Sequence, residues 1–195
     1  MHKNVDWRLF WRLAPFGMLG GFLGAYLLTG IDGKNLIPFI FTYLGLMGIF
    51  ILYRTFRPVR AKKIPLAAVP PLGAAGGFVD AVGGGGWGPI VTTTLVGAGE
   101  EPRYVIGTVN TAEFFVTVAT SAGFLTALLI GHWEDAGDLT KHAAAVAGLV
   151  AGGILAAPLA GYFVKVTPRR NLGLLVGLLI LALSGYQAAR YFKLF

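Results

Sequence analysis

The residues best suited to chemistry lie in one glycine-dense stretch, residues 76–89, which reads GGFVDAVGGGGWGP. Four consecutive glycines at 83–86 carry a high backbone entropy cost in a helix, and Pro89 has no amide hydrogen for a helix interior. We therefore expect a helix to end here. Glycine amides at a helix end have no side chain to shield them, so they can form a concave site for an anion. Breaks of this kind are typical of the substrate sites of secondary transporters.

Asp80 and Glu113 are the acidic residues that lie deep in apolar segments. Ionisable groups in such segments are costly and indicate function. A carboxylate beside an anion site repels the anion unless it is protonated. Two roles stay open for Asp80: proton coupling, or a clamp that accepts hydrogen bonds from the glycine amides. For Glu113 the clamp is the favoured role.

The composition predicts an all-α, polytopic membrane protein. Of the 195 residues, 55% are hydrophobic and 13% charged, and the mean hydropathy of +0.70 is too high for a soluble domain of this size. The net charge of +7 comes from short basic clusters between apolar segments, which is typical of orientation signals and argues against nucleic acid as a partner. The absence of cysteine excludes thiol nucleophiles, disulfides and thiolate metal sites. We expect no cofactor, no metal and no removable signal peptide.

The apolar segments are separated by short polar connectors. The third is interrupted: an arm of about fourteen residues precedes the glycine break and an arm at 90–96 follows it. Each arm alone is shorter than the roughly 30 Å hydrocarbon core, so the segment is either a broken span or a re-entrant hairpin. The positive-inside rule places the basic loop at 54–63 in the cytoplasm. The predicted segments are residues 13–29, 36–53, 66–99, 104–130, 143–164 and 172–191.

Small residues line the first apolar segment. Gly17, Gly20, Gly21 and Gly24 form overlapping small-xxx-small pairs. Such pairs allow the backbone of another helix to approach closely. We expect these glycines to serve helix packing.

Two parts of the chain resemble each other in order and spacing. Residues 4–9 and the later Gly20-Gly21 match residues 137–139 and the later Gly152-Gly153. Residues 34–36 likewise match residues 170–172. The match predicts one and a half internal repeats. Residues 1–63 would be the second part of a first repeat, and residues 64–195 a complete second repeat containing the broken segment.

The glycine stretch at 76–89, together with residues 107–115 (GTVNTAEFF), resembles the TauE/SafE family of membrane permeases, the sulfite exporter group. The resemblance covers essentially the whole chain. It implies a multi-pass carrier of the bacterial or archaeal cytoplasmic (inner) membrane that moves sulfite, sulfonates or related organosulfur anions. Full-length members carry a glycine signature in each half, whereas this sequence has only the second. A truncated, non-transporting membrane subunit or assembly factor is therefore the alternative, and a homo-oligomer is one way to complete a site.

On this resemblance, the substrate-binding groups are the amides of the break and nearby polar side chains. The start of a half-helix near Pro89 carries about half a positive charge, which favours an anion. The alternatives are that the glycines only allow tight helix crossing and that the polar groups bond between helices. Trp87 either gates the cavity or packs. The predicted substrate-binding residues are Gly83, Gly84, Gly85, Gly86, Trp87, Gly88, Thr92, Thr93, Thr108, Asn110 and Thr111.

An intramembrane protease is the main enzyme alternative, and its motifs are missing. A presenilin-type site needs Gly-x-Gly-Asp, but Asp80 follows Phe78 and Val79. A rhomboid-type site needs Gly-x-Ser-Gly, which neither Ser121 nor Ser184 provides. His132 and His142 lie near a membrane edge, where we expect them to be solvated. The sequence therefore predicts no catalytic residues.

Overall fold

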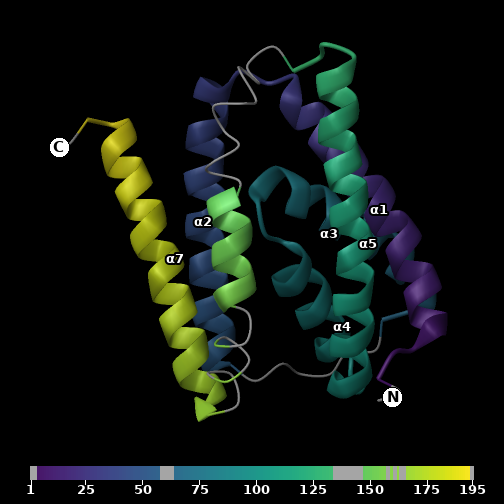
Figure 1. The fold of residues 1–195 in the computed structure, drawn as a ribbon. Helices are drawn as coiled ribbons and strands as arrows, with labels where there is room; N and C mark the ends of the chain where they lie inside the picture. Colours follow the sequence, from purple (N-terminus) through teal and green to yellow (C-terminus); the bar gives the residue numbers. More distant parts are fainter. Residues whose placement is uncertain are drawn as a thin grey trace. The chain divides into compact units, whose positions relative to one another are not determined.

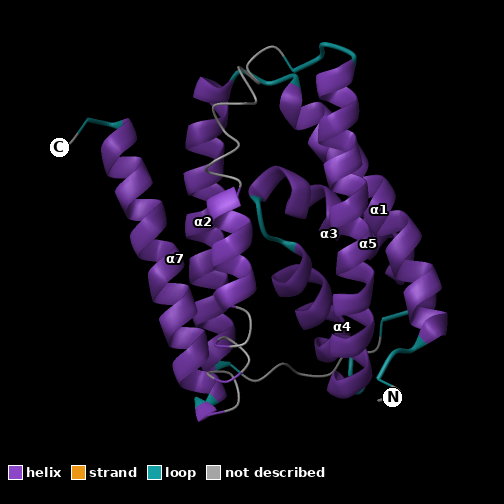
Figure 2. Cartoon of the chain, in the orientation of Figure 1, coloured by secondary structure: helices purple, strands orange, loops and turns teal. Residues whose placement is uncertain are grey.

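In the computed structural model, residues 4–57, 64–133, 147–156, 159, 162 and 166–193 are described. Every regular element in this part of the chain is helical, which confirms the all-α prediction. Figures 1 and 2 show the arrangement. The elements are α1 (Trp7–Thr29), α2 (Gly33–Phe56), the 3-10 helix η1 (Leu66–Ala68), α3 (Val69–Gly83), the π-helix η2 (Gly88–Thr92), α4 (Thr93–Gly97), α5 (Pro102–Leu129), a helical segment at Ala147–Ala156, and α7 (Arg169–Tyr191).

Within the described residues, four helices are long and apolar enough to cross a membrane: Asn35–Phe56, Leu66–Gly83, Pro102–Leu129 and Arg170–Tyr191. The second of these corrects an expectation, because the first arm of the broken segment is longer than about fourteen residues and is not too short to cross. Its helix continues through Gly76 and Gly77, where close packing of Gly76 on Val91 and of Gly77 on α1 offsets the low helix propensity of glycine. The predicted span at 143–164 is described only in part, and His142 lies outside the described residues.

Helix α1 begins earlier than the apolar segment that predicts it. It starts at Trp7 because the carboxylate of Asp6 accepts hydrogen bonds from the amides of Arg8 at 2.9 Å and Leu9 at 3.2 Å. An aspartate at this position satisfies two amides that a helix start leaves without partners.

The chain divides into two compact units. The first comprises Met1–Ile40 and Val59–Glu134, and the second comprises Phe41–Pro58 and Asp135–Phe195. Each unit draws on two separate stretches of sequence. The predicted boundary between residues 63 and 64 separates two sequence repeats, whereas these units are defined by contacts in space. The repeat boundary therefore stays a prediction.

In the first unit, α3 and α5 both pack along α1 and run parallel to it (Figure 1). The glycines of α1 lie at these contacts, as predicted. Gly20 faces the Ala74 carbonyl of α3, and Gly21 faces Thr120 of α5. The approach is close from both sides, because Gly77 of α3 lies against the carbonyl of Gly17. The close packing of α3 and α5 on α1 therefore depends on glycines, which have no side chain to hold the helix backbones apart.

The broken segment folds back within the first unit. Val69, at the start of α3, and Leu95, in α4, are both buried in the core that contains Leu9 and Val105, the early residues of α1 and α5. The chain thus rises along α1 as α3, turns at the glycine break and returns through η2 and α4 to the level where α3 began. The other buried members of this core are Phe10, Leu13, Ala14, Trp87, Val91, Val109, Ala112 and Val116.

In the second unit, the later part of α2 packs antiparallel to α7. Gly45 lies against Ser184, and Gly173 lies against Thr55, so the two helices run in opposite directions. The Ser184 hydroxyl also donates a hydrogen bond of 2.7 Å to the carbonyl of Phe41. Small residues again permit the close approach.

Gly77→Ala should destabilise the protein, because the new Cβ would meet the backbone carbonyl of Gly17, which cannot move aside as a side chain could. We expect a cost of about 1–3 kcal/mol, typical of overpacking. The measurement is denaturant unfolding of the detergent-solubilised protein. Gly185→Ala in α7 is the matched control, because its Cβ would meet no described atom within 4 Å. The close-packing interpretation is wrong if Gly77→Ala is as stable as this control.

Candidate functional site

The glycine break is a turn between two helices. Helix α3 ends at Gly83, and Gly84 adopts a left-handed conformation with φ of 71°. The Gly84 amide donates to the Asp80 carbonyl at 2.9 Å. A Cβ on Gly84 or Gly85 would meet nothing within 4 Å among the described atoms. Glycine is thus required here by backbone conformation and not by lack of space.

Asp80 joins the two sides of the break. It lies in the last turn of α3, and its Oδ1 accepts hydrogen bonds from the amides of Gly86 at 2.7 Å and Trp87 at 2.9 Å. This geometry is that of the clamp considered from the sequence. Two of the amides predicted to face an anion thus already contact a carboxylate of the protein itself. An amide pair that holds one oxyanion has the chemistry to hold another.

Trp87 anchors the returning arm, which consists of η2 and α4, to the rest of the first unit. Its side chain is fully buried, and its indole N–H donates to the carbonyl of Val109 in α5 at 3.1 Å. The ring lies against Gly17 of α1, where a Cβ would come within 2.5 Å of Trp87 Cη2, and against Gly76 of α3. Trp87 is therefore packed among three helices, which favours the packing alternative over the gate.

Glu113 lies one helical turn after Val109 on α5. It is partly buried, and its carboxyl group lies near enough to that of Asp80 for the two to interact electrostatically. The structure thus brings together Asp80, Gly86, Trp87 and Glu113, which come from α3, the break and α5.

The predicted hydroxyl ligands have other partners. Thr108 is fully buried, and its Oγ1 accepts a hydrogen bond of 2.8 Å from the amide of Asp6 at the start of α1. The hydroxyl of Thr111 donates to the Gly107 carbonyl at 2.7 Å, and that of Thr93 to the Pro89 carbonyl. A hydroxyl that donates to its own helix offers an anion no donor in this conformation.

Among the described residues, two further predicted ones make no side-chain hydrogen bond to the break. Thr92 is half-buried within η2, and Asn110 is exposed on α5. Their assignment to substrate binding stays a prediction.

The π-helix η2 is a feature that sequence reasoning missed. It spans Gly88–Thr92, directly after the break. Short π-helical turns are rare and frequently lie at functional sites. The sequence carries no signal for it, because Pro89 lies in the first turn, where its missing amide hydrogen would have no partner within the helix in any case.

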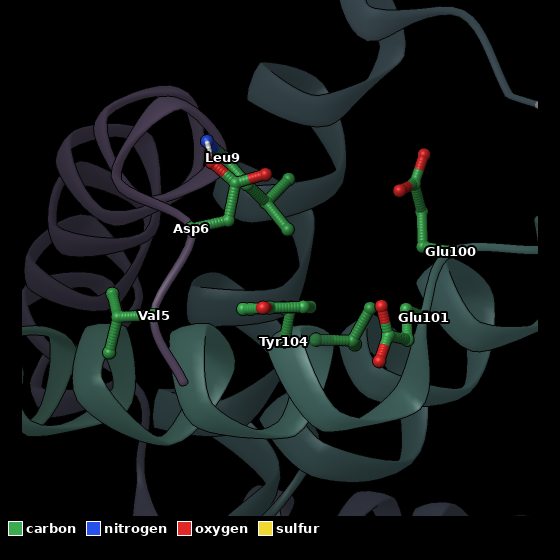
Figure 3. Close-up of a pocket in the computed structure, with 7 residues that line it drawn as sticks. Val5, Asp6, Leu9, Glu100, Glu101 and Tyr104 are labelled. Atoms are coloured by element: carbon green, nitrogen blue, oxygen red, sulfur yellow. Dashed lines mark hydrogen bonds between the residues drawn. The ribbon is translucent and has the colours of Figure 1, made fainter. Parts of the chain in front are cut away.

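A second missed feature is an open pocket of about 340 Å³ beside the start of α5 (Figure 3). Three acidic residues, Asp6, Glu100 and Glu101, line it together with Val5, Leu9, Tyr104 and Val105. Figure 3 shows Asp6 approaching from the segment before α1 and Glu101 and Tyr104 from the opposite wall. Three carboxylates repel an anion, so this pocket does not fit the predicted substrate. The adjacent pair Glu100-Glu101 is the signal that could have found it.

A bundle of apolar helices with a broken helix at its candidate site has the organisation of a membrane transporter. The sequence model of the family described as sulfite exporter TauE/SafE matches residues 1–187, and the chain belongs to this family. It is 41% identical over 181 residues to the probable membrane transporter protein YtnM of Bacillus subtilis (strain 168). The alignment covers 89% of this chain and 58% of that relative, so the chain spans little more than half the relative's length. No solved structure matches the chain.

Asp80→Ala should destabilise the break, because it removes the acceptor of two amide hydrogen bonds. Losing a cap of this kind costs about 0.5–2 kcal/mol. Asp80→Asn keeps one side-chain oxygen as an acceptor and removes the repulsion with Glu113, so its cost should be smaller. Unfolding in detergent, followed by tryptophan fluorescence, gives the order of stabilities. An Ala variant equal in stability to the wild type would refute the clamp.

Proposed function

We propose that the protein is a permease of the bacterial or archaeal cytoplasmic membrane that moves a small sulfur-containing anion such as sulfite or a sulfonate. Membership of the TauE/SafE family supports this proposal at the level of a membrane transporter. The observation that carries the site assignment is the pair of amides, from Gly86 and Trp87, that hold a carboxylate at the break. The protein would act without a catalytic residue, a metal or a cofactor.

The substrate would bind at the amides of residues 83–88, where the returning arm begins. The first amides of a helix carry partial positive charge and no permanent full charge, so they attract an oxyanion and still release it. A carrier needs both properties, because a very tight site would trap its substrate. Sulfite and sulfonates present negatively charged oxygens, as Asp80 presents its Oδ1 to the same amides.

A proton would move with the anion. Protonation of Asp80 removes its charge, weakens its hydrogen bonds to Gly86 and Trp87, and so makes their amides accessible to a substrate oxygen. Glu113, near enough to interact with Asp80, would serve as the second carboxyl group of the pair. Anion binding and protonation would then favour each other.

The test of the transport proposal is flux of labelled sulfite into liposomes that contain the full chain. Gly85→Leu should lower the initial rate at least ten-fold, because φ of 156° at this position is accessible to glycine and strained for leucine. Gly185→Leu on α7 is the matched control. Circular dichroism and gel filtration separate a folded, inactive variant from a misfolded one.

Equal flux through wild type and a folded Gly85→Leu variant would contradict the site assignment. Absence of sulfite flux through the folded wild type would contradict transport by this chain alone. That result would favour a non-transporting subunit or assembly factor.

If a proton accompanies the anion, the wild-type rate should rise as the pH on the side of entry falls. Asp80→Asn carries no titratable group at this position, so its flux should depend less on pH. The measurement compares initial rates of both proteins in liposomes with and without an imposed pH gradient. A pH dependence that is the same in both proteins argues against Asp80 as the coupling group.

A further inference from the structure

Three arginine side chains stack on aromatic rings at one end of the second unit. Two lie in or just after the last turn of α2, and the third lies in the first turn of α7. The pairs are Arg54 on Phe50, Arg57 on Tyr53 and Arg170 on Phe56, with guanidinium carbons 5.6, 5.5 and 5.2 Å from the ring centroids.

The stack of Arg170 on Phe56 brings cations from two helices together. The neighbouring contact of Gly173 with Thr55 holds the start of α7 against the end of α2. Arg57 and Arg170 are both exposed. Neither α2 nor α7 contains an aspartate or a glutamate, so these two helices provide no carboxylate that could neutralise the arginines. The result is a positively charged helix end.

The chemistry of this end fits a phosphodiester. Stacking on a ring uses the face of a guanidinium group and leaves its N–H groups at the edge available for two parallel hydrogen bonds to phosphate oxygens. The arginines lie at the ends of two helices that are apolar enough to span a membrane, which is the level of lipid headgroups. Aromatic side chains are likewise enriched at this depth.

Beyond the arginines, exposed apolar side chains continue along both helices. Ile49 on α2 and Leu175 and Leu178 on α7 are more than half exposed. A free phosphate ion would leave this apolar surface unused, whereas the acyl chains of a lipid would cover it. The combination of cations and adjacent apolar surface therefore favours a lipid over a small soluble anion.

We propose that Arg57 and Arg170 form a binding site for the headgroup of an anionic phospholipid at the α2–α7 end. The site is separate from the glycine break and does not depend on the transport proposal. It would hold the end of α2 and the start of α7 together through a shared phosphate.

The full chain, purified in detergent micelles, is titrated with phosphatidylglycerol, and retained lipid is counted by native mass spectrometry. Phosphatidylcholine with the same acyl chains is the comparison lipid. Each arginine near a headgroup contributes about five-fold in affinity, so Arg57→Gln with Arg170→Gln should weaken phosphatidylglycerol binding about thirty-fold. Arg190→Gln, at the other end of α7, is the matched control and should bind as the wild type does.

The proposal is overturned if the double variant binds as the wild type does, or if Arg190→Gln loses as much affinity. It is also overturned if inorganic phosphate displaces the lipid at equal concentration, because the site would then recognise a free anion. The single variant Arg57→Gln, expected to bind about five-fold more weakly, provides the same test if the double variant does not fold. Lipid counting is independent of sulfite flux, so the two proposals can fail separately.

Discussion

A helix that ends within a packed unit must still satisfy its backbone amides, and this constraint governs the first unit. In hydrocarbon each amide without a partner costs several kcal/mol. The break contains several amides that a continuous helix would satisfy, since Gly83 ends one helix and Gly88 begins the next. Asp80 satisfies three amides of the break: its carboxylate accepts hydrogen bonds from Gly86 and Trp87, just before the second helix, and its backbone carbonyl accepts one from Gly84. One residue thus closes one helix and opens the other.

Trp87 attaches the returning arm further, because it buries the largest side chain of the core and bonds to the α5 backbone. Val91 and Leu95 of the same arm are buried in this core as well. Room for the Trp87 ring exists because Gly17 lacks a side chain, and Gly76 in the same way leaves room for Val91 of η2. Gly17 of α1, although far from the break in sequence, therefore helps to hold the break in place. Backbone satisfaction at the break and close helix packing around it depend on each other.

The sequence was sufficient for features that follow from residue type. A run of glycines next to Pro89 indicates a helix end, and glycines at intervals of three and four in α1 indicate close helix contact; both are present. It was insufficient where the outcome depends on a partner elsewhere in the chain. The first arm continues as a helix through Gly77 because α1 lies against it, which local propensity does not reveal. Thr108 is among the predicted substrate-binding residues, but its hydroxyl pairs with Asp6 across the fold.

The position of Asp80 also bears on how tightly a substrate could bind. A side chain held within the same molecule competes at a high effective concentration, in the millimolar range or above for short flexible connections. A substrate that uses the amides of Gly86 and Trp87 must displace this carboxylate, so its apparent affinity is lower than the bare amides would give. In a site that must bind its ligand very tightly, this competition would be a disadvantage. For a carrier it would be useful, because the carboxylate would return to the amides and satisfy them once the substrate had left.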